Sequence, residues 1–444
     1  MMKTQQELPV SPCAEPETFV VVNALIPCLD AAKNHDLLIS RGRIAAVVPS
    51  GETAGALGAP SDAARIDAGG QRLFPSFIDA HVHLREPGQE YKEDIESGLR
   101  AAAYGGFGAV MAMPNTRPIN DEASVTRYML QKAAKHHPNG PRLLPVGALT
   151  MGIAGYELAP FGELAEAGCV ALSNDGHPVT DTEIFRRGME YAAQWGLKVI
   201  DHCEDIFLAK GAHMNEGEIS GRIGVKGQPV VAEALHVARD ILLSEYLDLP
   251  VHLAHISCRQ SVELIAFAKA RGLKVTAETC PHYLLLDESR LENYDPMAKV
   301  NPPLRTPEDV AAIRRAIKDG SIDILVTDHA PHADHEKEQT LDEAPCGIIG
   351  LESALPLTYS LVRDGLISEQ DFTRLWHTRP AEIFSIAVNN FQPGDPADFF
   401  LFDPDAQWRL DRDSIHSKSL NTPFLGSVMR GKVSAHWLGG RRIV

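Results

Sequence analysis

The feature that most constrains the fold is an alternation of short apolar runs with helical patterns along most of the chain. Each apolar run has the length of a buried β-strand, and nearly every one ends in polar residues. The segments between them carry helical periodicity and helix signals, such as a Thr cap at 306 with Asp three residues later. The eight runs cover residues 73–83, 108–115, 142–149, 169–175, 197–205, 251–257, 273–282 and 322–332.

Eight strand–helix units in series predict an α/β fold, a parallel (β/α)8 barrel. An open doubly wound sheet is the alternative, but polar residues at nearly every strand end favour the barrel. Both flanks of the barrel predict short β-strands, too few on either side for a core, so we expect them to combine into one small β domain. The expected organisation is a flexible leader at 1–17, β-domain parts at 18–72 and 388–444, and the barrel at 73–387.

Composition excludes several function classes. The formal charge of −17 argues against nucleic acid or an anionic membrane as the main partner. No apolar run approaches the ~18 residues of a membrane span, and the first residues lack the apolar core of a signal peptide. The seven cysteines form no C-x-x-C pair, a pattern typical of free thiols in a reducing compartment. We therefore expect a cytoplasmic protein.

Ionisable residues at the strand ends predict a metal site. Residues two apart in a strand share a face, so His81, His83 and Arg85 project the same way. Because the carboxyl ends of barrel strands converge, groups from other strands meet them there. A buried hydrogen-bond network is the competing interpretation, but so many unpaired buried charges would be costly. Six candidate ligands suit two metal ions that share a bridging carboxylate: His81, His83, Asp175, His202, His255 and Asp328.

Five motifs extend the argument from a metal site to a family. The stretches FIDAHVHLREPGQEYKEDI, MPNTRP, DHCED, NPPLR and VTDHAPH resemble dihydroorotases of the bacterial class I type, in the amidohydrolase superfamily. The resemblance covers essentially the whole chain. It implies reversible cyclisation of N-carbamoyl-L-aspartate to L-dihydroorotate, the third step of de novo pyrimidine biosynthesis, with two zinc ions per subunit. By analogy it also implies a homodimer or larger assembly and leaves association with aspartate carbamoyltransferase open.

The resemblance also implies roles for individual residues. His81, His83 and Asp328 match the ligands of one zinc, and His202 and His255 match those of the second. Asp175 matches the bridging carboxylate, where hydantoinases and allantoinases carry a carboxylated lysine. Asp328 is also the expected proton shuttle. The residues expected to contact substrate are His83, Arg85, Asn115, Asn301, His332 and the backbone of Gly347.

Three positions depart from the pattern of this family. Asn174 stands where many members have Asp, Cys346 where an aromatic residue is usual, and Ser76 where glycine is common. Two further histidines, His282 and His329, are candidates for orienting a ligand. The alternative functions are an allantoinase or hydantoinase and a non-catalytic subunit of aspartate carbamoyltransferase. Arg85 and the missing lysine weigh against the first pair, and the complete ligand set weighs against the last.

Overall fold

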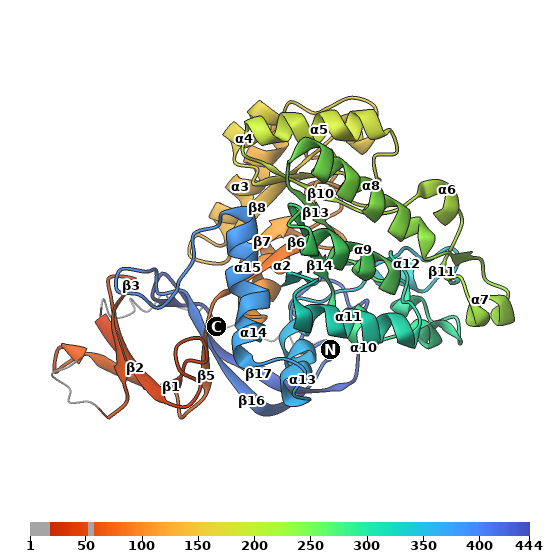
Figure 1. Cartoon of the computed structure of the whole chain (residues 1–444). Helices are drawn as coiled ribbons and strands as arrows, with labels where there is room; N and C mark the ends of the chain where they lie inside the picture. Colours follow the sequence, from red (N-terminus) through yellow and green to blue (C-terminus); the bar gives the residue numbers. More distant parts are fainter. Residues whose placement is uncertain (1–17, 52–56) are drawn as a thin grey trace, which may run out of the picture.

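Eight parallel strands form the wall of the barrel in the computed structural model, which describes residues 18–51 and 57–444 (Figure 1). The strands neighbour one another in chain order, and a parallel bridge between Val82 and His329 joins the last to the first. The fold class predicted from the eight apolar runs is confirmed; the expected leader at 1–17 lies outside the described residues. The strands are β6 (Phe77–Val82), β7 (Phe107–Ala112), β8 (Arg142–Ala148), β9 (Ala171–Ser173), β10 (Lys198–Asp201), β13 (Val251–Leu253), β14 (Val275–Thr279) and β15 (Ile324–Leu325).

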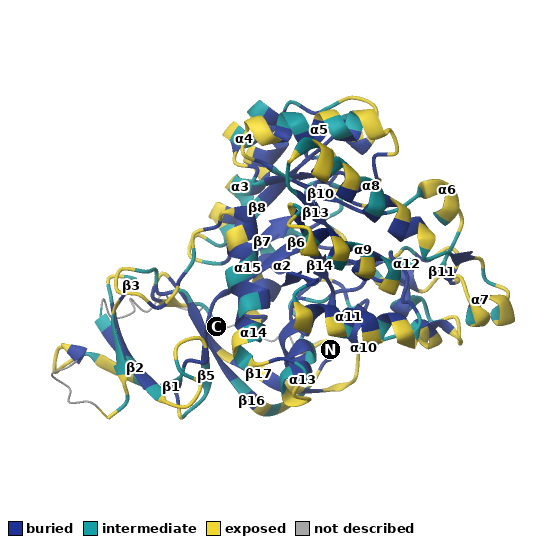
Figure 2. Cartoon of the chain, viewed as in Figure 1, coloured by how far each residue is buried: buried dark blue, intermediate teal, exposed yellow. Residues whose placement is uncertain are grey.

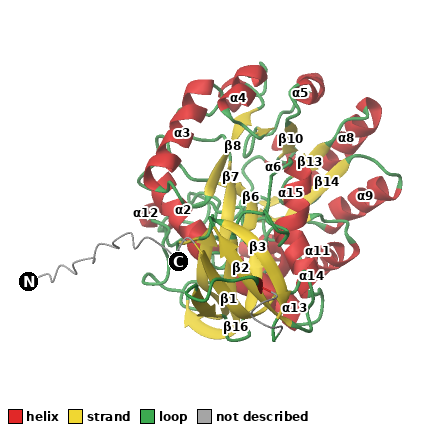
Figure 3. Ribbon diagram, turned by 90° about the vertical axis from the view of Figure 1, so that its left-hand side faces the viewer, coloured by secondary structure: helices red, strands yellow, loops and turns green. Residues whose placement is uncertain are grey.

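Helices follow the barrel strands and pack around them (Figure 3). The predicted cap is present, because Thr306 caps the helix it precedes. Asp181 caps another helix in the same way and accepts hydrogen bonds from the backbone of Glu183 and Ile184. No helix among the described residues is both long and apolar enough to cross a membrane. The main helices are α2 (Ile95–Tyr104), α3 (Ala123–His136), α4 (Phe161–Ala167), α5 (Thr182–Gln194), α8 (Val231–Leu247), α9 (Arg259–Ala270), α11 (Pro307–Asp319), α13 (Ala354–Arg363), α14 (Glu369–Thr373) and α15 (Arg379–Phe384), with a π-helical turn η4 (Arg374–Thr378) before α15.

Short elements lengthen the loops that follow several strands. Because loops at the carboxyl ends of barrel strands border the mouth, these insertions surround the predicted site. They are η1 (Met151–Ile153), α6 (Ile206–Ala209), β11 (Met214–Asn215), α7 (Glu218–Ile223), β12 (Gly227–Gln228), α10 (Pro281–Leu285), η2 (Glu288–Leu291), η3 (Pro296–Ala298) and α12 (Asp334–Lys337).

Both ends of the chain build a second sheet beside the barrel (Figure 1). Its N-terminal and C-terminal halves join where β5 pairs antiparallel with β16, with Arg72 opposite Phe402. This pairing confirms the expectation that the two flanks combine into one sheet. The strands are β1 (Thr18–Leu25), β2 (Asn34–Ser40), β3 (Arg43–Pro49), β4 (Ala64–Asp67), β5 (Arg72–Pro75), β16 (Phe399–Arg409), β17 (Val428–Leu438) and β18 (Arg441–Arg442).

The apolar run 73–83, expected as one barrel strand, is two strands, and this expectation was wrong. Pro75 has no backbone N–H, and the N–H of Ser76 donates to Asp398 of the second sheet. The next N–H, from Phe77, donates to Gly106 within the barrel. The chain therefore changes sheets at Ser76, so β5 belongs to the second sheet and only β6 belongs to the barrel.

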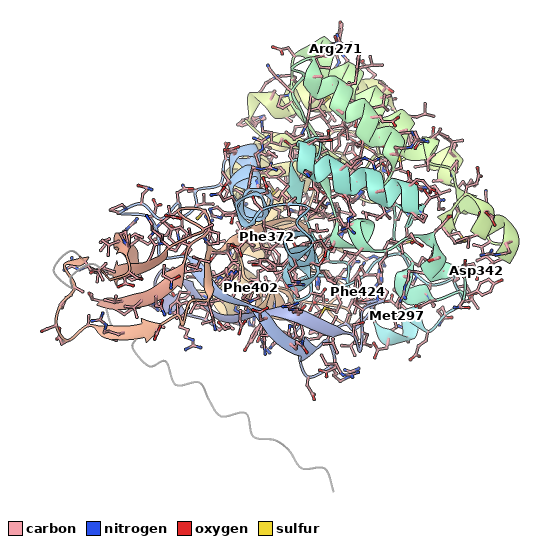
Figure 4. All side chains as sticks on the ribbon, turned by 60° about the horizontal axis from the view of Figure 1, so that its bottom comes forward. Arg271, Met297, Asp342, Phe372, Phe402 and Phe424 are labelled. Atoms are coloured by element: carbon pink, nitrogen blue, oxygen red, sulfur yellow. The ribbon has the colours of Figure 1, made fainter. Side chains whose placement is uncertain are left out.

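Aromatic side chains fill the junction between the barrel and the second sheet. The ring of Phe74 lies 5.7 Å from Phe372 and 6.2 Å from Phe402, and Figure 4 labels the last two. Strands β6 and β7 of the barrel are buried along their whole length (Figure 2). The base of the barrel is thus packed against protein, which leaves the mouth as the end that substrate can enter.

Candidate metal centre and active site

The six predicted ligands meet at the mouth of the barrel. His81 lies on β6 with His83 just after it, and the other four follow β9, β10, β13 and β15. All six side chains are buried. These side chains lie close together although they are up to 247 residues apart in the sequence. Closure of the barrel, and not local sequence, therefore brings them together.

Asp175 lies at the centre of the group. Its Oδ1 is 3.3 Å from His81 Nε2, 3.5 Å from His202 Nδ1 and 3.4 Å from His255 Nε2. Its Oδ2 is 3.4 Å from His83 Nε2. Since the two oxygens face different imidazoles, this carboxylate can serve two neighbouring cations at once.

Asp328 completes a second group. Its Oδ1 lies 3.1 Å from His83 Nε2 and 3.6 Å from His81 Nε2. The backbone at Asp328 has a φ of 48°, and that at His255 has a φ of 31°. Such left-handed conformations cost free energy in residues with a side chain, and they cluster where a site constrains the chain.

The donor atoms fit a metal site. Imidazole nitrogens and carboxylate oxygens are ligands of Zn²⁺. His81 Nε2 and His255 Nδ1 are fully buried and have no hydrogen-bond partner among the described residues. The predicted ligands form two sets, and within each set the potential ligand atoms all lie within 4.8 Å of one another. The first set is His81, Asp175 and His255, and the second is His81, His83 and Asp328.

His202 joins the first set through an unexpected nitrogen. Its Nδ1 lies 2.9 Å from His255 Nε2, while its Nε2 faces Asn301 Nδ2 at 3.2 Å and Glu204 at 3.6 Å. The imidazole therefore presents Nδ1 to the metal ligands and its other edge to a residue predicted to contact substrate.

Carboxylates shift the pKa of His81 and His202. Burial lowers the pKa of His81, but Asp175 and Glu278 outweigh it and raise that pKa well above its usual value. Burial also lowers the pKa of His202. Asp175 and Glu204 outweigh burial and raise that pKa to about 10. A metal must displace these protons in order to bind, so affinity is expected to fall with decreasing pH.

Two residues behind the ligands fix their orientation. Glu278 Oε1 accepts a hydrogen bond from His81 Nδ1 at 2.7 Å, and its Oε2 lies 3.0 Å from His252 Nε2. Asn115 Oδ1 accepts from His83 Nδ1 at 2.8 Å. Both contacts place a proton on Nδ1, so Nε2 is the nitrogen that His81 and His83 present to Asp175 and Asp328.

Arg85 is a buried cation beside this centre. Its Nε donates to the carbonyl of Pro331 at 3.1 Å, and no carboxylate among the described residues lies within 4.0 Å of its guanidinium nitrogens. The neighbouring Glu86 is engaged elsewhere, by Lys132 at 2.9 Å and by Tyr128 at 2.8 Å. Glu86 and Arg85 therefore form no salt bridge with each other.

His332 and Gly347 lie together beside Arg85. His332 Nε2 donates to the carbonyl of Cys346 at 2.8 Å, and its Nδ1 lies 3.3 Å from Lys92 Nζ. Burial, followed by the nearby cations, lowers the pKa of His332 to about 2, so its imidazole is neutral. The N–H of Gly347 already donates to Lys299, so the residue has no spare backbone donor for a substrate.

The comparisons with known proteins agree with this geometry. A family model described as Dihydro-orotase-like matches residues 70–261. The dihydroorotase of Geobacter metallireducens is 46% identical over 91% of this chain and 94% of its own length. That of Syntrophotalea carbinolica is also 46% identical, over 94% of this chain and 96% of its own length. The chain belongs to the dihydroorotase family.

Among solved structures, the fold is shared with a hydantoinase. The L-hydantoinase (dihydropyrimidinase) of Arthrobacter aurescens superposes with a TM-score of 0.82, covers 96% of both chains and is 24% identical. This similarity confirms the barrel with its accompanying sheet. The dihydroorotase relatives, at nearly twice that identity, assign the family of cyclic amide hydrolases.

The three departures from the dihydroorotase pattern have visible consequences. Asn174 donates to Thr150 Oγ1 at 2.7 Å and accepts from the Thr150 backbone at 3.0 Å, so its amide braces the end of β8. Ser76 Oγ lies 2.8 Å from His436 Nε2 in the second sheet. Cys346 has an exposed side chain, and its carbonyl accepts from His332. None of the three reaches the metal ligands.

The remaining candidate histidines take different positions. His329 Nε2 lies 3.2 Å from Glu93 and its Nδ1 accepts from the backbone of Gly350, so its imidazole contacts no predicted ligand. Its backbone carbonyl accepts the N–H of His83 at 2.8 Å. His282 is buried, and burial lowers its pKa to about 4. Sequence reasoning missed Glu278, whose only signal is a charged residue inside an otherwise buried strand.

Proposed function

We propose that this protein is a zinc-dependent dihydroorotase that converts N-carbamoyl-L-aspartate reversibly to L-dihydroorotate and water. The observation that carries the proposal is the position of Asp175 among four imidazoles beside a buried arginine without a carboxylate partner. This activity would place the protein in de novo pyrimidine synthesis.

Two zinc ions would be held by the six clustered ligands. His81, His83 and Asp328 would bind one ion, His202 and His255 would bind the other, and Asp175 would serve both. Zinc bound there would supply an activated water and polarise the ring carbonyl. The six residues provide nitrogen and oxygen donors in the number that such a pair requires.

Asp328 would move the proton. Burial raises the pKa of Asp328, but His83 and the other imidazoles outweigh it and hold that pKa well below the usual range. The ionised Oδ1 can accept the proton of the attacking water and return it to the leaving ring nitrogen. In the biosynthetic direction the same oxygen would remove a proton from the carbamoyl nitrogen.

Arg85 would bind the substrate carboxylate. A guanidinium offers two parallel N–H donors to a carboxylate, and this one forms no salt bridge with any carboxylate of the described residues. A fixed buried cation also explains how a chain of net charge −17 can attract an anion. Asn115, Asn301 and His332 would add contacts at the rim, whereas Gly347 would do so only through a rearranged backbone.

The test is zinc content measured together with turnover. Protein reconstituted with Zn²⁺ is expected to bind two ions per chain and to prefer dihydroorotate over hydantoin and allantoin, as judged by kcat/KM. The Asp328→Asn variant serves as the catalytically impaired control. A higher kcat/KM on hydantoin or allantoin, or no turnover by zinc-loaded protein, would refute the proposal.

Assembly and location stay predictions. The family resemblance implies a homodimer or larger assembly by analogy and leaves association with aspartate carbamoyltransferase open, whereas the cytoplasmic location is predicted from the cysteine pattern. Sedimentation of the purified protein with and without that transferase would test the first two.

A further inference from the structure

A polar segment from the C-terminal region reaches the mouth of the barrel. Residues 416–422, the crossing segment, lie between β16 and β17 of the second sheet. Loops usually expose their polar side chains, but Ser417, Ser419, Asn421 and Thr422 are all buried. Buried polar groups need partners, and the partners of this segment belong to the active-site loops.

Asn421 makes the largest set of these contacts. Its Nδ2 donates to the carbonyls of Ala330 at 3.0 Å and Gly347 at 2.9 Å, and its Oδ1 accepts from the backbone of His332 at 3.0 Å. Its own carbonyl accepts from Ile349. An asparagine amide has two N–H donors and an acceptor oxygen, and all of them are used here. No other side chain of this size satisfies the same three partners.

The crossing segment also supports the imidazole of His332 indirectly. Ser419 Oγ donates to the carbonyl of Lys92 at 2.7 Å, and Lys92 Nζ in turn lies 3.3 Å from His332 Nδ1. Asn421 holds the backbone of His332 while Ser419 holds the residue that contacts its ring. The position of His332 therefore depends on this segment at two points.

The metal ligands have separate supports. The backbone N–H of Thr327 and its hydroxyl both donate to Asp79, and the N–H of His83 donates to the carbonyl of His329 at 2.8 Å. These bonds fix the chain on both sides of Asp328 without help from Asn421. Loss of Asn421 is thus expected to disturb the 330–347 region before it disturbs the metal centre.

We propose that Asn421 is a positioning residue of the active site, which acts on substrate binding through His332. The inference rests on the proposed function, because it takes His332 as a substrate contact. It assigns a role in substrate binding to a residue of the second sheet's connecting loop, 89 residues beyond the loop that carries His332.

The first test is the Asn421→Asp variant, which keeps the shape but removes both donors. The KM for dihydroorotate is expected to rise at least 10-fold while zinc content stays at the wild-type value. The matched control is Asn389→Asp, a buried asparagine at the base that bridges Asp398 and Phe391 in the same manner. This control is expected to lose thermal stability without a change in KM.

A double-mutant cycle distinguishes positioning from a general structural effect. If Asn421 acts through His332, then adding Asn421→Asp to His332→Ala should raise KM less than twofold further. A full additive effect in that background, or a normal KM in Asn421→Asp, overturns the inference. Should the Asp variant not fold, Asn421→Ser keeps one donor in a smaller side chain and is subject to the same criteria.

Failure of the proposed function gives a different result. Zinc-loaded wild-type protein without dihydroorotate turnover refutes the function and, with it, this inference. Normal wild-type turnover with an unaffected Asn421→Asp variant refutes the inference alone.

Discussion

His436 at the base of the barrel and His81 at its mouth are both fully buried, yet their imidazoles meet different partners. At the base, His436 Nδ1 donates to the carbonyl of Ala103 and its Nε2 lies 2.8 Å from Ser76 Oγ, each at hydrogen-bond distance. At the mouth, His81 Nδ1 donates to Glu278 while Nε2 faces two aspartates. Burial lowers the pKa of His436 to about 4, whereas carboxylates raise that of His81.

The arginines at the two ends of the barrel also have different partners. At the base, Arg379 pairs with Asp323 and Glu382, each at 2.7 Å. At the mouth, Arg85 donates to a backbone carbonyl and has no carboxylate partner among the described residues. At the base, His436 and Arg379 pair with other groups of the protein. At the mouth, the aspartates that face His81 can bind cations, and Arg85 can bind an anion. This difference distinguishes ionisable groups that are paired within the protein from groups of the same residue type that can bind a ligand.

The largest effect is expected from Asp175→Asn. An amide has one acceptor oxygen in place of two, so it cannot serve the imidazoles on both sides. We expect zinc content to fall sharply and turnover to drop below detection, as measured by metal analysis and dihydroorotate hydrolysis. The same change at the base, Asp398→Asn, is expected to keep both. Retention of full zinc by Asp175→Asn would contradict the central role of this carboxylate.

A smaller effect is expected from Arg85→Ala. Loss of a charge-assisted pair costs about 1.5–3 kcal/mol, which corresponds to a KM increase of roughly 10- to 100-fold. Zinc content should stay intact, and steady-state kinetics with metal analysis measure both. Arg379→Ala at the base should lower stability and leave KM unchanged. If Arg85→Ala instead releases zinc, the residue is structural.

Glu278→Gln tests the support behind His81. A residue that orients a metal ligand contributes about 10- to 100-fold to metal affinity. The amide keeps the shape of Glu278 but weakens the acceptor for His81 Nδ1, so zinc affinity should fall within this range. Competition with a chelator measures the change. An unchanged affinity would show that His81 is held by its strand alone.

The smallest effect concerns stability at the base. In the folded protein burial depresses the pKa of His436 to about 4, while an unfolded histidine titrates near 6.5. Between these two pKa values, His436 binds a proton in the unfolded chain but not in the folded protein. The free energy of unfolding therefore falls as pH decreases. His436→Gln should remove about 2 kcal/mol of that loss between pH 7.5 and pH 5. Urea unfolding of both proteins checks this, and equal pH dependence would reject it.

Sequence reasoning predicted the part of the site that periodicity controls. His81 and His83 share a strand face, and every other ligand follows a strand of the same barrel, so closure alone brings them together. The caps at Asp181 and Thr306 were predictable because their hydrogen bonds are local.

Features that depend on distant partners were not predictable. The run 73–83 is interrupted at Ser76 because the N–H of Ser76 donates to the carbonyl of Asp398. No local sequence pattern predicts that contact. Asn421 reaches His332 through the topology of the second sheet. The choice of Nδ1 by His202 depends on Asn301 and Glu204, which face its other nitrogen.

The pairing of β5 with β16 has a consequence for synthesis of the chain. Arg72 lies opposite Phe402, about 330 residues later, and domains fold as units during translation at ~5–20 residues per second. The edge of β5 therefore stays unpaired for roughly 15–65 s, until β16 has been synthesised. A nascent chain that stalls within the barrel carries an open sheet edge, the kind of surface that templates aggregation.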